Sequence, residues 1–129
     1  MKKLSLVACA AILAGCLSSS PTPQAELEKN VERNIAAKNE LLFKETFGKA
    51  LNEEDAQKLN ECVAAALTTQ LTQNEKLVLG GNAKEKLEAK NDLESASKKI
   101  TIASSESKAA IKTCGTTLGV AKAISKIKL

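Results

Sequence analysis

The chain of 129 residues has no His, no Trp, no Tyr and only two Phe. Without imidazole it lacks the general base of Ser-His-Asp and Cys-His catalysis and the commonest metal ligand. Without Trp and Tyr it lacks the usual stacking surfaces for sugars and single-stranded nucleic acid. The sequence also has no residue cluster with zinc-ligand spacing and no phosphate-binding glycine loop. We therefore expect no enzyme, no metal or other cofactor, and no nucleic-acid partner.

The first residues have the pattern of an export signal. Met1-Lys2-Lys3 supplies a short basic segment, and residues 4–14 are apolar except for Ser5. This apolar run is much shorter than the roughly 20 residues that a membrane-spanning helix needs. Positive charge followed by a short apolar run is typical of a secretory signal, which we assign to residues 1–15.

The end of this signal is its most informative part. Leu13-Ala14-Gly15-Cys16 resembles the lipobox of bacterial lipoproteins at all four positions. In that family the chain is cut before the cysteine, whose sulfur and new amino group receive acyl chains such as palmitate. The resemblance implies that Cys16 is lipidated and that membrane lipid is a partner, since two or more acyl chains anchor a protein firmly.

The residue after the lipidated cysteine bears on the choice of membrane. In lipoproteins of the enterobacterial type, Asp at that position favours retention in the inner membrane. This chain has Leu17 there. The resemblance therefore implies a lipid-anchored protein of the cell envelope, in the outer membrane rather than the inner.

Two cysteines remain for the folded domain. Cys9 leaves with the signal and Cys16 takes lipid, which leaves Cys62 and Cys114 on an exported chain. Oxidation is the default outside the cytosol, and two cysteines have one intramolecular pairing. We expect a disulfide, with two separate thiols as the alternative.

The rest of the chain predicts an all-α fold. Residues 16–24 comprise the lipidated cysteine and a flexible tether, since three serines and two prolines occur there without charge. In the domain at 25–129, apolar residues recur every three or four positions. The spacing predicts helices over 25–51, 52–71, 72–79, from 82 to about 103, and from 107 onward. We expect a small antiparallel bundle of four to five helices stapled by the disulfide.

Capping signals mark the boundaries of these helices. Asn52, Thr72 and Asn82 are expected N-caps, the last two with Glu at capping-box spacing, and the serines at 104–107 are an expected break. The predicted apolar stripe beyond Asn82 includes Leu87 and Leu93. The only aromatic residues, Phe43 and Phe47, are one helical turn apart and belong either to the core or to a partner-binding surface.

Charge is unevenly distributed along the domain. Residues 25–62 have a net charge of −3 and residues 63–129 a net charge of +5, with no acidic residue after Glu106. The last stretch retains five lysines: Lys108, Lys112, Lys122, Lys126 and Lys128. They suit contact with a membrane or another anionic surface. Alternatively, they complement a helix carboxyl terminus and pack against the acidic first helix.

These features predict a membrane-anchored helical lipoprotein acting as a non-enzymatic binding or accessory module, with an unknown envelope protein as partner. One alternative is a periplasmic chaperone or inhibitor. The small helical acid-stress chaperones of the envelope, which also have one long-loop disulfide, are similar in layout but share no motif with this chain. Another alternative is a surface-exposed interaction protein, such as an adhesin or an exclusion factor for plasmids or phages.

Overall fold

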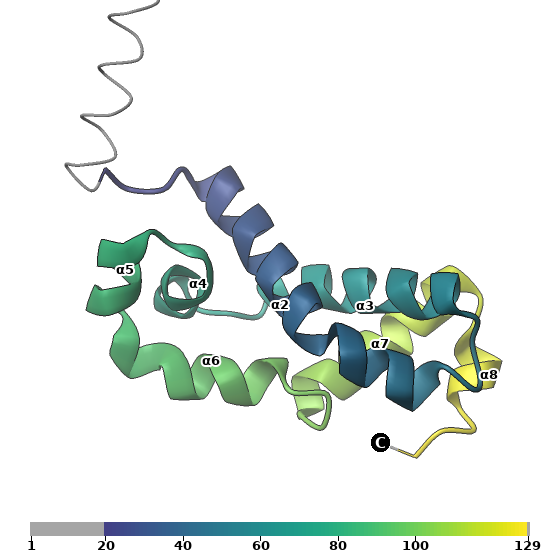
Figure 1. Cartoon of the computed structure of the whole chain (residues 1–129). Helices are drawn as coiled ribbons and strands as arrows, with labels where there is room; N and C mark the ends of the chain where they lie inside the picture. The colour runs from purple at the N-terminus through teal and green to yellow at the C-terminus, as the bar shows by residue number, and fades with distance from the viewer. Residues whose placement is uncertain (1–19, 129) are drawn as a thin grey trace, which may run out of the picture.

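The computed structural model describes residues 20–128, and within this range the chain forms helices and no strands (Figure 1). The all-α class is confirmed. The residues of the predicted signal and lipobox lie outside the described range. The helices of residues 20–128 are α2 (Gln24–Phe47), α3 (Glu53–Thr68), α4 (Gln73–Gly80), α5 (Ala83–Glu88), the 3₁₀ turn η1 (Lys90–Asp92), α6 (Leu93–Ile100), α7 (Ser105–Leu118) and α8 (Ala121–Ile124).

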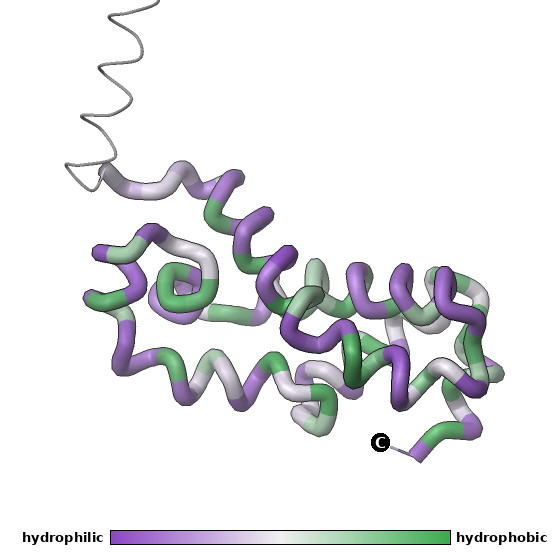
Figure 2. Tube along the Cα trace, in the orientation of Figure 1, coloured by the Kyte–Doolittle hydropathy of each residue, from purple (hydrophilic) through white to green (hydrophobic). Residues whose placement is uncertain are grey.

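The main core lies where α2, α3 and α7 pack together, and their apolar faces meet there (Figures 1 and 2). Phe43 and Phe47 are 1% and 0% exposed with ring centroids 5.3 Å apart, so both belong to this core. The other fully buried large side chains of this cluster are Leu27, Val31, Ile35, Leu59, Val63, Leu67, Ile100 and Ile111. A smaller apolar cluster at the other end joins Val78 on α4, Ala89 just after α5, and Ala96 on α6.

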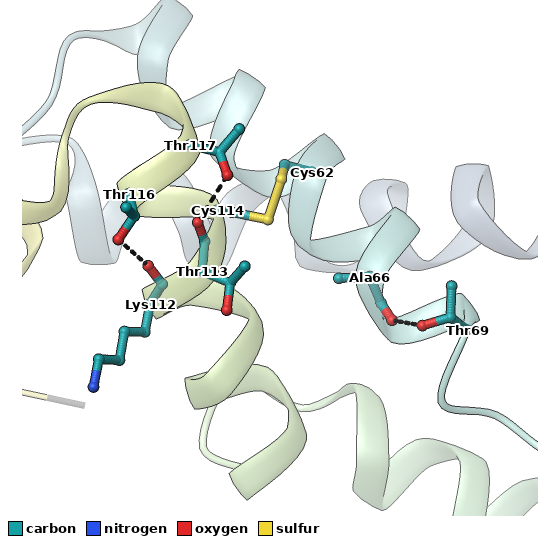
Figure 3. Close-up of a disulfide and its surroundings, with 8 residues drawn as sticks. All are labelled: Cys62, Ala66, Thr69, Lys112, Thr113, Cys114, Thr116 and Thr117. Carbon is teal, nitrogen blue, oxygen red and sulfur yellow. Dashed lines mark hydrogen bonds between the residues drawn. A yellow bond between two sulfur atoms is a disulfide. The ribbon is translucent and has the colours of Figure 1, made fainter.

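The predicted disulfide is confirmed. Cys62 on α3 and Cys114 on α7 are bonded, with their Cα atoms 5.9 Å apart (Figure 3). Cys114 is only 2% exposed and forms part of the core. The bond therefore joins two helices that are far apart in sequence but already share an apolar interface.

The predicted caps are also confirmed. Of the break predicted at residues 104–107, only Ser104 lies outside a helix: it is the N-cap of α7, which begins at Ser105. The side chains of Asn52, Thr72, Asn82 and Ser104 each accept a hydrogen bond from the backbone N–H three residues on. At Thr72 and Asn82 the capping box is complete, because Glu75 and Glu85 accept from the N-cap N–H in return. Each cap satisfies backbone donors that the first helical turn leaves unpaired.

Four predicted helices are shorter than expected, and one of them is the second, which ends at Thr68 rather than at residue 71. The first ends at Phe47 rather than at residue 51. The helix expected from residue 82 to about 103 is interrupted at η1, so Leu87 and Leu93 leave the predicted stripe and are 64% and 48% exposed. The last helix ends because Gly119 adopts a left-handed conformation with φ of 75°, which glycine tolerates and which separates α8 from α7. These breaks raise the count of α-helices in residues 20–128 to seven.

Asparagine side chains fix how α2 lies against its neighbours. The amides of Asn30 and Asn34 donate to the carbonyls of Gly80 and Leu79 at the end of α4, at 3.2 and 2.7 Å. The buried amide of Asn39 donates to the Ile100 carbonyl at 3.0 Å. These bonds satisfy carbonyls that helices leave unpaired at their carboxyl ends.

We predict that Gly80→Ala lowers the free energy of unfolding by about 1–3 kcal/mol, the usual cost of overpacking a core. A Cβ on Gly80 would lie 2.7 Å from Cγ2 and 2.8 Å from the backbone N of Val31, so α2 and α4 would have to separate. This cost opposes the gain in helix propensity of about 1 kcal/mol. Urea denaturation measures the net change in the free energy of unfolding. An unchanged or higher midpoint would show that α2 and α4 accommodate the added methyl group without a net loss of stability.

Candidate functional site

A groove lies between α7, α8 and the residues that follow α8. Its volume is about 380 Å³. The floor is apolar and the rim is basic or hydroxylated. It is lined by Lys108, Ile111, Lys112, Thr116, Ala121, Ile124, Ser125 and Ile127. A groove of this size with an apolar floor and few polar groups is the kind of surface on which proteins bind ligands and peptide segments.

Glycines shape this groove. The left-handed Gly119 reverses the chain after α7, and the Val120 N–H donates to the Gly115 carbonyl at 2.8 Å. A Cβ on Gly115 would lie 2.7 Å from Cδ1 of Ile124, so glycine at this position lets α8 approach α7 closely. The two glycines four residues apart thus act in helix termination and helix packing.

The five lysines singled out in the sequence are all exposed. Lys108 and Lys112 line the groove, and Lys122 belongs to α8. The Lys112 side chain points away from the disulfide (Figure 3). Within residues 20–128, no carboxylate lies within 4.0 Å of any of the five, so the structure has no ion pair between them and the acidic first helix. Their charges therefore face solvent.

The opposite end of the molecule holds the start of the described chain (Figure 1). Thr22 donates to both carboxylate oxygens of Glu85, from Oγ1 at 2.6 Å and from its N–H at 3.3 Å. The Asn82 amide donates to the Ser20 carbonyl at 3.0 Å. The hydrogen bond from the Thr22 hydroxyl is the main reason that the pKa of Glu85 lies below its usual value. Residues 20–22 are thus held against the start of α5.

An ion pair with a buried carboxylate joins α4 and α6. Glu75, whose side chain is 2% exposed, accepts a hydrogen bond from Nζ of Lys99 at 2.7 Å and from the Thr72 N–H at 2.8 Å. Burial raises the pKa of Glu75, but hydrogen bonds from Lys99, Thr72 and Ser95 and the charge of Lys99 outweigh it, and the pKa lies below its usual value. The sequence marked Glu75 only as a capping residue; nothing in the local pattern pointed to Lys99.

Residues 20–128 contain no group of three or more His, Cys, Asp or Glu side chains placed to bind a metal ion. In the same range no helix combines the length and the apolar character needed to cross a membrane. No protein-family model matches the chain, and neither a curated protein nor a solved structure matches it.

Proposed function

We propose that the protein is a lipid-anchored lipoprotein of the bacterial envelope, held in the outer membrane by acylated Cys16, and that its helical domain is a non-enzymatic binding module. The anchor is supported by the lipobox-like Leu13-Ala14-Gly15-Cys16 after a basic and apolar signal. A disulfide between Cys62 and Cys114 suits an exported chain. The missing histidine argues against the commonest modes of acid–base and nucleophilic catalysis.

The groove between α7 and α8 is the observation that supports a binding role most strongly. Its isoleucine floor offers apolar contact, and Lys108 and Lys112 on its rim have no acidic partner within residues 20–128. These features fit an acidic, amphipathic segment of an envelope protein. Apolar side chains of the segment would cover the isoleucines, while its carboxylates would approach the lysines and speed association.

The test is capture of envelope proteins from detergent extracts by the soluble Cys16→Ser domain with its disulfide intact. We predict that Lys108→Glu/Lys112→Glu abolishes capture of the partner, because both rim charges are reversed. Lys38→Glu/Lys49→Glu is the matched control: it makes the same charge change at exposed lysines of α2 and the turn after it, and should leave capture unchanged. Equal capture by both double variants would show that the groove is not the binding surface.

A periplasmic chaperone is a second candidate, favoured by the buried Glu75–Lys99 pair. Acid would protonate Glu75, weaken the contact between α4 and α6, and expose apolar surface. Chaperone activity therefore predicts binding of a hydrophobic dye near pH 3 with helix content retained. A domain that stays compact and does not bind dye at that pH would argue against this function.

A further inference from the structure

We propose that α5, η1 and the start of α6 form a membrane-contact surface, with Leu87 and Leu93 inserted among the lipid headgroups beside the anchor. This inference rests on the proposed lipid anchor at Cys16 and adds the face of the domain that meets the membrane. The surface is defined by Leu87, Leu93 and three flanking lysines, Lys84, Lys86 and Lys90.

The start of the described chain places α5 close to the anchor. The Thr22–Glu85 and Asn82–Ser20 hydrogen bonds hold residues 20–22 against the beginning of this helix. Only four Cα–Cα steps separate Ser20 from Cys16, which limits their distance to about 15 Å even in a fully extended chain. If Cys16 is acylated at the bilayer surface, Ser20 lies within about 15 Å of it, and the start of α5 lies next to Ser20.

The side of α5 turned to solvent has the composition of an interfacial surface. Leu87 is 64% exposed and Leu93 48% exposed, although both are large apolar side chains. The buried Ala89, which follows α5 as its C-cap, packs in the smaller apolar cluster, whereas Leu87 does not belong to either apolar cluster. Lys84 and Lys90 lie three residues before and after Leu87, are exposed, and can extend toward lipid phosphates while their stems cover apolar surface.

Acidic residues in the same segment determine how this contact should respond to salt. Glu85 is directed toward Thr22, and Glu94 pairs with Lys98 at 3.0 Å. Residues 83–94 nonetheless contain four acidic and three basic side chains. We therefore expect the contact to depend mainly on insertion of the leucines and to change little with ionic strength.

The position of α8 favours this surface over the carboxyl-terminal lysines. In Figure 1, α8 lies at the end of the molecule opposite to α5 and the start of the described chain. A domain held beside Cys16 by residues 20–22 would meet the membrane through α5, leaving the groove between α7 and α8 at the far end, open to a partner.

Lipid quenching of a single thiol-linked fluorophore tests this proposal on the full acylated protein. With Cys16 acylated and Cys62 bonded to Cys114, an introduced cysteine is the only free thiol. Bimane is attached to Leu93→Cys, to Leu41→Cys on α2 and to Lys122→Cys on α8, all exposed positions. Each protein is reconstituted into phosphatidylethanolamine–phosphatidylglycerol vesicles that contain a doxyl-labelled lipid, and flotation measures anchoring.

We expect several-fold stronger quenching at position 93 than at positions 41 and 122, and loss of most of that quenching when Leu87→Ser is added. Equal quenching at the three positions in protein that floats with the vesicles would overturn the α5 surface while leaving the anchor intact. Stronger quenching at 122 than at 93 would overturn it in favour of the carboxyl-terminal lysines. Failure of the unlabelled protein to float would refute the lipid anchor, and the surface with it.

Discussion

Removing the Cys62–Cys114 disulfide should lower the free energy of unfolding by about 4 kcal/mol. The two cysteines are 52 residues apart, and closing a loop of that length reduces the entropy of the unfolded chain by an amount of this size. Small domains are stable by only about 5–15 kcal/mol in total. For a domain of this size the loss corresponds to a fall in Tm on the order of 15 °C.

Alanine variants separate the bond from other effects of substitution. Cys114 is 2% exposed, so serine there would also bury a hydroxyl and add a cost unrelated to the bond. We expect Cys62→Ala, Cys114→Ala and the double variant to have similar Tm values, and the wild-type protein treated with dithiothreitol to approach them. A double variant with twice the loss of either single variant would mean that each side chain stabilises the fold through packing rather than through the bond.

Local sequence signals predicted much of this fold. The caps at Asn52, Thr72 and Asn82 depend on a side chain and a backbone donor three residues apart, so the sequence alone specifies them. The buried face of α2 follows from apolar residues at helical spacing. The disulfide followed from elimination among four cysteines rather than from geometry.

The interruptions and the contacts between helices could not be predicted in this way. The proline-free run from residue 82 to about 103 reads as one helix, whereas the chain is interrupted at η1 and Leu87 is exposed to solvent. The amides of Asn30 and Asn34 bond to carbonyls of α4 that are about 50 residues away in sequence. A local sequence pattern does not predict contacts over such a separation. The five lysines were recognisable from the sequence. The groove that two of them line was not, because it forms only when α7 and α8 pack together.

The Glu75–Lys99 pair is expected to make the domain sensitive to acid. Glu75→Gln should lower the free energy of unfolding at pH 7 by about 2 kcal/mol, less than for a fully buried pair because Lys99 is 28% exposed and its ammonium group can turn to water. The glutamine oxygen can still accept from the Thr72 N–H and preserve that part of the cap. Urea denaturation at a series of pH values measures both stabilities.

The pH dependence has a definite sign. The pKa of Glu75 in the folded protein lies below its usual value, so the unfolded chain binds more protons as the pH falls past that usual value. The stability that Glu75 provides is therefore fully present above about pH 5 and is lost as the pH falls through the lower, folded-state pKa. Wild type and Glu75→Gln should differ at pH 7 and converge toward pH 3.

Glu94→Gln is the matched control for this experiment. Glu94 pairs with Lys98 at 3.0 Å, a similar distance, but the two side chains are 81% and 74% exposed. An exposed pair contributes between about 0 and 1 kcal/mol, so this variant should unfold close to wild type at every pH. A Glu75→Gln variant that keeps a constant difference from wild type down to pH 3 would show that the carboxylate's role is packing and capping rather than charge. Convergence for Glu75→Gln alone would assign the acid response of the α4–α6 contact to this one buried carboxylate.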